Sequence, residues 1–250
     1  RCIIFVDQSF EVLISDVTKP EKQKLLKQQL TSNIAHELKT PLSSIKGYLE
    51  TILSNPNIPE EKKMYFINKA FAQAERLTDL LNDISLLNNI EDAGGLFEFK
   101  SLMLKPVIHD VVENLKHRLT EKNMDCTVDV GKEVIVNGNE SLLFSVFQNL
   151  IENSINYAGN DAKITVRKYL EDDKFYYFQY SDTGTGIAEE HLTRIFERFY
   201  RVDYGRSRET GGTGLGLSIV KNAILLHKGT ISVRNKPEGG LEFLFSLSKK

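Results

Sequence analysis

A histidine followed at once by a glutamate is the first pattern in this sequence that could do chemistry. His36 and Glu37 open the run HELKTP, which ends at Pro41. A carboxylate beside an imidazole can hold the proton of one ring nitrogen and so present the other nitrogen as a nucleophile. A lone exposed histidine is normally inert, but Pro41 cannot donate to the carbonyl of Glu37 and weakens the helix within that turn. The combination favours a nucleophilic His36.

Two glycine-rich stretches could hold a phosphate-bearing ligand. They are DTGTGI at 182–187 and GGTGLGL at 211–217. Glycine lets backbone N–H groups approach a ligand without a Cβ in the way, and the helix that follows the second stretch favours an anion at its N-terminus. Taken singly, a tight strand–helix turn explains such a stretch about as well. No Lys-Ser/Thr follows the glycines, which excludes a P-loop, and the HRD and DFG motifs of Ser/Thr/Tyr kinases are missing.

A pair of asparagines provides a third candidate, for a metal ion. Asn149 and Asn153 are four residues apart in NLIEN and share one helix face, with Glu152 next to them. Carboxamide oxygens near a phosphate chain are reasonable ligands for Mg²⁺, which prefers hard oxygen donors and keeps some of its waters. Without the other motifs, a solvated or capping pair of asparagines is the better interpretation.

Two long helices must position the histidine. From about Glu21 to Ser54, apolar residues recur every three or four positions and form one stripe: Leu26, Leu30, Ile34, Leu38, Leu42, Ile45, Leu49 and Ile52. His36 lies about 200° around the helix from its stripe neighbours on either side, so we expect an imidazole that faces solvent, with Thr40 one turn on along the same face.

A second helix follows the breaker Asn55–Pro59 and runs to about Asn88. Its heptad seam consists of Ile67, Ala70, Ala74, Leu77, Leu81 and Ile84. Two helices of this length cannot bury both stripes against one small neighbour, so the sequence predicts a helical hairpin that dimerises into a four-helix bundle. The alternative is an elongated monomer packed on the rest of the chain.

The remainder of the chain mixes helical and strand periods, which predicts an α+β sandwich with a largely antiparallel sheet. Upstream of the helices, residues 3–17 predict a strand pair or the end of a β-domain. The expected elements after the Asp92–Gly95 linker are helices at 105–122, 139–157 and 215–227 and strands at 127–136, 163–170, 174–181, 229–235 and 241–247.

The composition argues against several classes of protein: nucleic-acid-binding, disulfide-rich, zinc-binding and membrane-spanning. The 250 residues carry a net charge of −2, so no global basic field favours nucleic acid or anionic lipid. Cys2 and Cys126 are too few for a disulfide framework or a zinc site, which suits a reducing cytoplasm. No run of about 18 apolar residues predicts a membrane span. The chain begins at Arg1 inside an apolar run, and we expect it to be a piece of a longer protein.

Five motifs in order then resemble the H, N, G1, F and G2 boxes of sensor histidine kinases of two-component systems. They are HELKTP, NLIEN, DTGTG, IFERFYR and GGTGLGLS, and the resemblance covers roughly residues 20–250. It implies a dimerisation and histidine-phosphotransfer hairpin followed by a catalytic ATP-binding domain of the Bergerat fold. The domains expected are 1–20, the end of an upstream sensory domain and a connector; 21–91, dimerisation and phosphotransfer; 92–96, the linker; and 97–250, the catalytic domain.

The resemblance implies a role for each matched residue in the helical part. His36 is similar to the phosphoacceptor, and Glu37 to the acid/base that orients and deprotonates it. Thr40 matches the position that, in such kinases, places a water for dephosphorylation of the partner's aspartate.

In the catalytic part, Asn153 resembles the Mg²⁺ ligand, with Asn149 a helper on the phosphate side. Asp182 resembles the aspartate that reads the adenine amino group, and Tyr157 the aromatic residue beside the base. Arg201, directly after the F box, matches a basic residue that can reach the γ-phosphate. The loops around the nucleotide are matched at Gly184, Gly186, Gly212, Gly214 and Gly216.

Two positions depart from the family pattern. Asn156 stands where many relatives have a lysine that contacts the terminal phosphates, so a cation is missing there. One of the loop arginines could compensate: Arg194, Arg198, Arg201, Arg206 and Arg208. Ser154 stands where the family usually has alanine, and we expect this replacement to be silent.

The function that the resemblance implies is ATP-dependent autophosphorylation of His36 and transfer to an aspartate of a response regulator, with phosphatase activity on that regulator. ATP and Mg²⁺ are the expected ligands, and a response-regulator receiver domain and a second copy of the chain the expected partners. Asp16-Val17-Thr18 also resembles the exit motif of PAS sensor domains, although a chance strand end explains it almost as well. By family analogy, we expect the cytoplasmic portion of a membrane-anchored bacterial sensor.

Two other interpretations stay open. One is a Bergerat-fold ATPase whose hydrolysis drives a clamp motion without phosphohistidine. The other is a silent coiled-coil scaffold, which the missing lysine at Asn156 makes conceivable. Neither needs a histidine and a glutamate on the exposed face of a helix.

Overall fold

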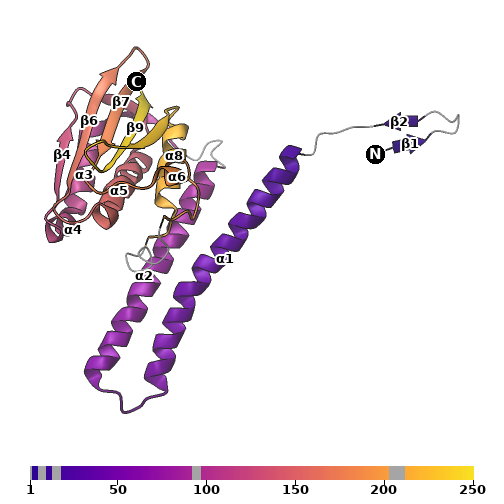
Figure 1. The fold of residues 1–250 in the computed structure, drawn as a ribbon, viewed down its shortest axis with the longest axis vertical. Helices are drawn as coiled ribbons and strands as arrows, with labels where there is room; N and C mark the ends of the chain where they lie inside the picture. Colours follow the sequence, from indigo (N-terminus) through magenta and orange to yellow (C-terminus); the bar gives the residue numbers. More distant parts are fainter. Residues whose placement is uncertain (1, 5–9, 13–17, 92–96, 203–211) are drawn as a thin grey trace. The chain divides into compact units, whose positions relative to one another are not determined.

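Two structural units make up the chain in the computed structural model, Arg1–Gln73 and Ala74–Lys250 (Figure 1). The residues described are 2–4, 10–12, 18–91, 97–202 and 212–250, with side chains described from residue 31 onward. The expected PAS exit residues Asp16 and Val17 and the expected linker at 92–96 lie outside the described residues. The domain boundaries given above therefore stay predictions.

The first unit contains a strand pair, helix α1 and the first part of helix α2, whose remainder belongs to the second unit. Strands β1 (Cys2–Ile4) and β2 (Phe10–Val12) pair antiparallel, as the upstream apolar run predicts. Helix α1 (Thr18–Leu53) and helix α2 (Glu60–Glu91) are separated by the breaker, where Ile58 N–H donates to the Asn55 carbonyl at 3.0 Å. The rings of Tyr48 and Phe66 lie 6.0 Å apart, one on each helix.

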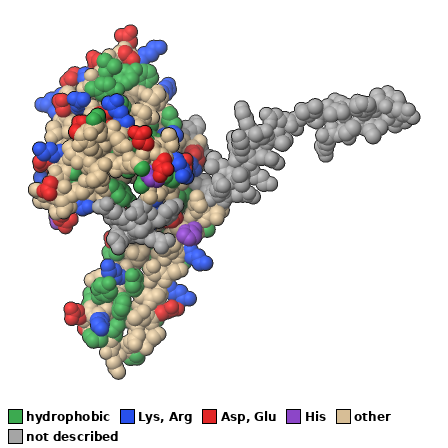
Figure 2. All heavy atoms as spheres, in the orientation of Figure 1, with side chains coloured by type: hydrophobic (Ala, Val, Ile, Leu, Met, Phe, Trp, Pro, Cys, Tyr) green, Lys and Arg blue, Asp and Glu red, His purple; other side chains and the backbone are tan. Residues whose placement is uncertain are grey.

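Much of the apolar surface of the two helices is uncovered in a single chain (Figure 2). On α1, Leu42 and Leu49 of the expected stripe are exposed, whereas Ile34, Leu38 and Ile45 are half-buried. On α2 the buried apolar residues are Ala70, Leu80, Leu87 and Ile90. Of the seam predicted for α2, Ala70 is buried, Leu77 and Ile84 are half-buried, and Ile67, Ala74 and Leu81 are exposed.

The second unit continues from α2 into a helix-and-sheet domain. Its helices are α3 (Leu104–Asn114), α4 (Lys116–Glu121), α5 (Glu140–Tyr157), α6 (Glu189–Leu192) and α8 (Gly216–Leu226). Its strands are β3 (Lys100–Met103), β4 (Asp125–Asp129), β5 (Ile135–Gly138), β6 (Lys163–Glu171), β7 (Phe175–Ser181), β8 (Ile231–Asn235) and β9 (Leu241–Ser248).

Five of these strands form the main sheet, in the order β4-β6-β7-β9-β8. Only the β4–β6 pair is parallel among the described strands of this sheet, so it is largely antiparallel as predicted. Strands β3 and β5 form a separate antiparallel pair. The α+β class expected from the sequence is confirmed.

Helices α3, α5 and α8 cover one face of the main sheet (Figure 1). Alternate residues of β7 and β9 point into that layer, and Phe178, Tyr180, Phe243 and Phe245 are buried there. Phe147 of α5 packs against Phe245 with ring centroids 6.0 Å apart. This layer fixes α5, which carries the asparagines, against the strand that ends at the DTGTG stretch.

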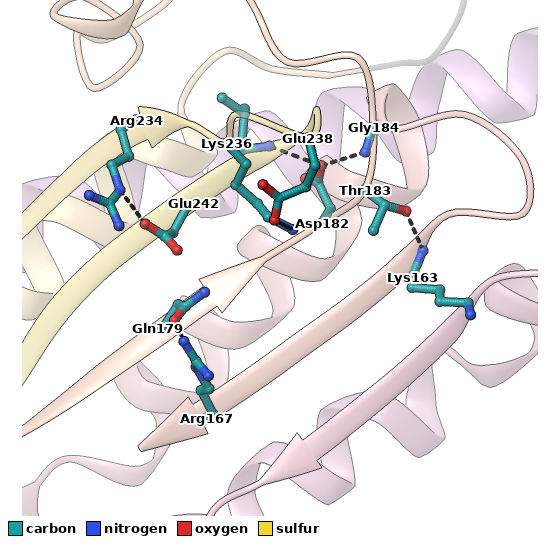
Figure 3. Close-up of polar contacts among 11 residues, drawn as sticks. Lys163, Arg167, Gln179, Asp182, Thr183, Gly184, Arg234, Lys236, Glu238 and Glu242 are labelled. Atoms are coloured by element: carbon teal, nitrogen blue, oxygen red, sulfur yellow. Dashed lines mark hydrogen bonds and ion pairs between the residues drawn. The ribbon is translucent and has the colours of Figure 1, made fainter. Parts of the chain in front are cut away.

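The other face of the sheet carries polar cross-strand pairs (Figure 3). Arg167 Nε donates to Gln179 Oε1 at 2.7 Å, and Arg234 pairs with Glu242. Because these residues alternate with the buried aromatic ones, β7 and β9 each present an apolar side and a polar side.

Three details differ from the sequence-based expectations. The helix predicted at 105–122 is two helices, since Leu115 leaves helical geometry with φ −95° and ψ 2°. The strand predicted at 127–136 is likewise two strands in different sheets, separated by a turn in which Val134 N–H donates to the Gly131 carbonyl at 3.3 Å. Strand β3 was not predicted at all.

Candidate functional site

The His36 side chain lies exposed on α1, as the position of this residue opposite the stripe predicts. It is 69% exposed, whereas that of Glu37 is 17% exposed. The His36 Nδ1 and Glu37 Oε1 atoms are 4.0 Å apart, at the outer limit of an ion pair. This separation is longer than a hydrogen bond, but it places the carboxylate on the Nδ1 side of the imidazole.

The turn after His36 is held by side-chain hydroxyls. Thr40 Oγ1 donates to the His36 carbonyl at 3.3 Å, and Ser44 Oγ donates to the Thr40 carbonyl at 3.1 Å. Pro41 is buried and leaves the Glu37 carbonyl without its usual i+4 donor. Helix α1 nevertheless continues through Pro41, so the expected defect is one missing hydrogen bond within an unbroken helix.

In the second unit, the asparagine face of α5 lies against the start of α8. Asn139 caps α5 by accepting from Leu142 N–H at 3.0 Å. Asn149 Nδ2 donates to the Ser145 carbonyl at 2.8 Å, and Asn149 Oδ1 lies so close to Gly216 that a Cβ there would clash. The N and G2 motifs are therefore neighbours in space, although Asn149 and Gly216 are 67 residues apart in the chain.

Asn153 lies half-buried on the same face of α5. Among the described residues, none forms a hydrogen bond with its side chain, so its amide oxygen is available to a ligand. One carboxamide oxygen, completed by phosphate oxygens and water, suits Mg²⁺, which binds few protein groups and keeps several waters. Among the described residues there is no cluster of three or more His, Cys, Asp or Glu side chains that could hold a metal by themselves.

Asp182 lies at the end of β7 and is 4% exposed. Its Oδ1 accepts a hydrogen bond from Gly184 N–H at 3.0 Å (Figure 3). The same oxygen accepts from Leu241 N–H at 3.2 Å. Its Oδ2 accepts from Ser154 Oγ at 2.8 Å. The carboxylate is thus an acceptor fixed by three donors, which suits it to receive one further N–H from a ligand.

One glycine of each loop lies against the C-terminal end of α5. A Cβ on Gly184 would be 2.7 Å from the Cα of Ala158, and one on Gly212 would be 3.1 Å from the Tyr157 hydroxyl. Gly186 and Gly214 have positive φ of 72° and 74°, which a side chain would strain. The structure therefore brings together at one end of the domain the residues that the sequence predicts for nucleotide binding.

The arginines expected to compensate for the missing lysine have other partners where they are described. Arg194 pairs with Glu197 at 3.2 Å and lies over the ring of Tyr200, and Arg198 pairs with Glu91 of α2. Arg201 Nη2 donates to the Gly212 carbonyl at 2.5 Å, which places it at the G2 loop. The remaining two, Arg206 and Arg208, lie outside the described residues.

A different arginine contacts Asn156. Arg118 of α4 donates from Nη2 to Asn156 Oδ1 at 3.1 Å and from Nη1 to Glu152 Oε1 at 2.9 Å. Glu152, Asn156 and Asn153 fall within about 100° of one another around α5. The side chain of Arg118, from the neighbouring helix, therefore contacts the position at which the family resemblance implies a lysine. This contact could not be predicted from the sequence.

Comparison with known proteins agrees with this geometry. Residues 26–93 match the family model described as His Kinase A (phospho-acceptor) domain, and residues 138–250 match that of Histidine kinase-, DNA gyrase B-, and HSP90-like ATPase. Phosphate regulon sensor protein PhoR of Pseudomonas aeruginosa is 32% identical over 232 residues, which cover 93% of this chain and 52% of PhoR. This chain belongs to the sensor histidine kinases.

Solved structures share the fold of this sensor histidine kinase. The Acinetobacter baumannii histidine kinase AdeS aligns with a TM-score of 0.70 at 25% identity, over 86% of this chain and 98% of that chain. Histidine kinase ThkA, solved in complex with response regulator protein TrrA, aligns with a TM-score of 0.69 over 97% of this chain and 69% of that chain. At 22% identity, the likeness to ThkA is one of fold alone.

This sensor histidine kinase spans about half the length of PhoR, 52%. In the part of the chain that the structure describes, no helix has both the length and the apolar character needed to cross a membrane.

One acidic residue of α2 lies against the G2 loop within the second unit. Thr213 Oγ1 donates to Asp83 Oδ2 at 2.8 Å. Burial raises the pKa of Asp83 from 3.8 to about 6, although the hydrogen bond from Thr213 opposes the shift. Asp83 has no distinguishing signal in the sequence, because an aspartate on a long polar helix is normally a solvated residue.

The raised pKa of Asp83 predicts a pH-dependent stability. Between about pH 4 and 6 the folded protein binds more protons at this site than the unfolded chain, so the site's contribution to stability falls as pH rises through that range. In Asp83→Asn the side chain stays neutral. We expect the free energy of unfolding of the variant, minus that of the native chain, to rise between about pH 4.5 and 7 in urea denaturation. A constant difference would contradict the assignment.

Proposed function

We propose that this chain transfers the γ-phosphoryl group of ATP to His36 and then passes it to an aspartate of a response regulator. The observation that carries the proposal is the exposed imidazole of His36 beside Glu37, in a domain that matches the phospho-acceptor family. The same chain contains an ATPase-type domain in which Asp182, Asn153 and the glycine-rich loops come together.

In the proposed step, His36 Nε2 attacks the γ-phosphorus in line, a new N–P bond forms, and the bond from phosphorus to the β,γ-bridging oxygen breaks to release ADP. Glu37 holds the proton on Nδ1, keeps Nε2 in its nucleophilic form, and accepts this proton as the N–P bond forms. Asn153, helped by Asn149, would hold Mg²⁺, which neutralises phosphate charge when bound. Positioning supplies most of the catalysis in such a transfer.

The nucleotide is proposed to bind with its adenine at Asp182 and Tyr157. Its phosphates lie along the loops that contain Gly184, Gly186, Gly212, Gly214 and Gly216, with Arg201 next to the G2 loop through its bond to Gly212. We propose that Thr40, whose hydroxyl is one turn from the imidazole, positions water when the kinase dephosphorylates its regulator.

A second copy of the chain and a response regulator are the proposed partners. The exposed apolar residues on both helices support a dimer, because a four-helix bundle would cover them. ThkA, which shares the fold, was solved in complex with a response regulator. We further propose that the chain is the cytoplasmic portion of a membrane-anchored sensor.

We also propose that Arg118 supplies the cation that Asn156 lacks. Arg118→Gln is expected to weaken ATP binding about tenfold and adenosine binding much less, since one charge-assisted contact near the phosphates is lost. The matched control is Lys116→Gln, because Lys116 lies two residues away in α4 and pairs only with Glu113 among the described residues. Calorimetric titration checks this, and equal ATP affinities in the two variants would contradict it.

The experiment that tests the proposed function follows the γ-phosphoryl group of labelled ATP. We expect label bound to the protein that survives alkali and is lost in acid, as a phosphoramidate is. Release of free phosphate without any protein-bound label would instead favour the ATPase interpretation, and failure to bind ATP would favour the scaffold.

A further inference from the structure

Two buried hydroxyl groups form a chain of hydrogen bonds that ends at the Asp182 carboxylate. Tyr180 on β7 is 0% exposed, Ser154 on α5 is 1% exposed and Asp182 is 4% exposed. The Tyr180 hydroxyl donates to Ser154 Oγ at 2.8 Å, and Ser154 Oγ donates to Asp182 Oδ2 at 2.8 Å. An alanine at position 154 could form neither of these hydrogen bonds, so the structure gives a physical reason to test whether the serine is silent.

Two hydroxyl protons serve the contacts of this chain. Burial raises the pKa of Tyr180 well above its usual value, so its phenol keeps the proton and can donate it. The Tyr180 hydroxyl also donates to the Leu150 carbonyl at 2.9 Å, so its one proton is shared between this carbonyl and Ser154 Oγ. Because a carboxylate can only accept, the single serine proton points to Asp182. Hydrogen bonds in such a chain strengthen one another.

These bonds determine how the carboxylate is oriented. Asp182 Oδ1 is occupied by the backbone N–H groups of Gly184 and Leu241, and Oδ2 by Ser154. With both oxygens held, the carboxylate cannot rotate about its Cβ–Cγ bond without losing a partner. The remaining lone pair of Oδ2 therefore points in one direction only.

We propose that Ser154, supported by Tyr180, is a positioning residue that aims Asp182 Oδ2 at the exocyclic amino group of adenine and so sharpens selection of ATP over purines that lack this donor. The inference rests on the proposed role of Asp182. Its chemical basis is that a hydrogen bond to a charged acceptor depends strongly on alignment. An alanine at position 154 would leave Oδ1 held by the two backbone N–H groups but would remove the hydrogen bond that fixes Oδ2.

The test compares two ligands that differ only in the 6-amino group, ATP and purine riboside 5′-triphosphate. Their dissociation constants are measured by calorimetry with Mg²⁺ for the native chain, Ser154→Ala, Tyr180→Phe and the double variant. The control is Ser246→Ala, which removes another buried hydroxyl, on β9, whose partners are at Thr230.

We expect the native chain and Ser246→Ala to prefer ATP at least about tenfold. In Ser154→Ala the affinity for ATP falls about five- to tenfold and that for the purine analogue changes less than about twofold, so the preference collapses. Tyr180→Phe also lowers the preference for ATP, by a smaller factor. The double variant binds ATP no more weakly than Ser154→Ala, because Tyr180 acts through the serine.

Each contrary outcome identifies what fails. If the native chain does not discriminate between the two ligands, the proposed adenine contact of Asp182 is wrong. If the native chain discriminates and both Ser154→Ala and Tyr180→Phe keep its preference, the positioning role is wrong. Equal weakening of both ligands in Ser154→Ala would show a structural role for the hydroxyl and would also overturn the inference.

Discussion

His36→Gln is expected to abolish incorporation of phosphate from ATP into the protein, with at least about a 1,000-fold loss, while leaving the dissociation constant for ATP within about twofold. Glutamine is close in size but has no nucleophilic nitrogen at neutral pH. Nucleotide binding should persist because the proposed nucleotide residues all lie in the second unit, whereas His36 lies in the first. Label incorporation and calorimetry are measured on the same preparation.

His117→Gln provides the matched control. His117 is also an exposed helical histidine with a glutamate nearby, its Nδ1 lying 3.6 Å from Glu121 Oε1, and its side chain is 85% exposed. If exposure and a neighbouring carboxylate were sufficient for a histidine to be phosphorylated, His117→Gln would also lower the labelling. We expect this variant to retain native labelling. Equal labelling of the His36→Gln chain and the native chain would refute the phosphoacceptor assignment.

Asp182→Asn is expected to weaken ATP binding at least about tenfold, and labelling should fall with it at subsaturating ATP. A hydrogen bond to a charged acceptor is worth about 1.5–3 kcal/mol. An asparagine must also place its NH₂ group on one of two positions that now accept from Ser154, Gly184 and Leu241. The NH₂ group would then face another hydrogen-bond donor. A carboxylate has no donor group, so this conflict does not arise in the native chain.

Asp129→Asn on β4 is the comparison, since Asp129 is exposed and lies on the strand at the sheet's edge. Urea denaturation of both variants separates a loss of binding from a loss of folding. If a properly folded Asp182→Asn chain binds ATP as tightly as the Asp129→Asn chain does, the assignment of Asp182 to the nucleotide site is wrong.

Much of the architecture could be predicted from sequence, because hydrophobic period and breakers act locally. The two long helices and the breaker at Asn55–Pro59 were predicted close to their observed bounds. The exposure of His36 followed from its position opposite the stripe. The family itself was evident because its motifs have glycines where other groups approach closely, the backbone of Ala158 at Gly184 and the side chain of Asn149 at Gly216.

The features missed depend on contacts between distant segments. The apolar period runs through Leu115, so the break between α3 and α4 leaves no local trace. Ser154 and Asp182 are 28 residues apart, and Arg118 and Asn156 are 38 apart. A serine in place of alanine and an arginine on a polar helix have no special meaning until the fold brings their partners to them.

Location of the phosphoryl group is the most direct test of the central claim. The native chain is incubated with ATP and Mg²⁺, digested at alkaline pH, and sequenced by electron-transfer mass spectrometry. The predicted result is one phosphorylated peptide, modified on the His36 imidazole. A phosphoryl group on a serine, threonine or other histidine, with His36 unmodified, would contradict the account.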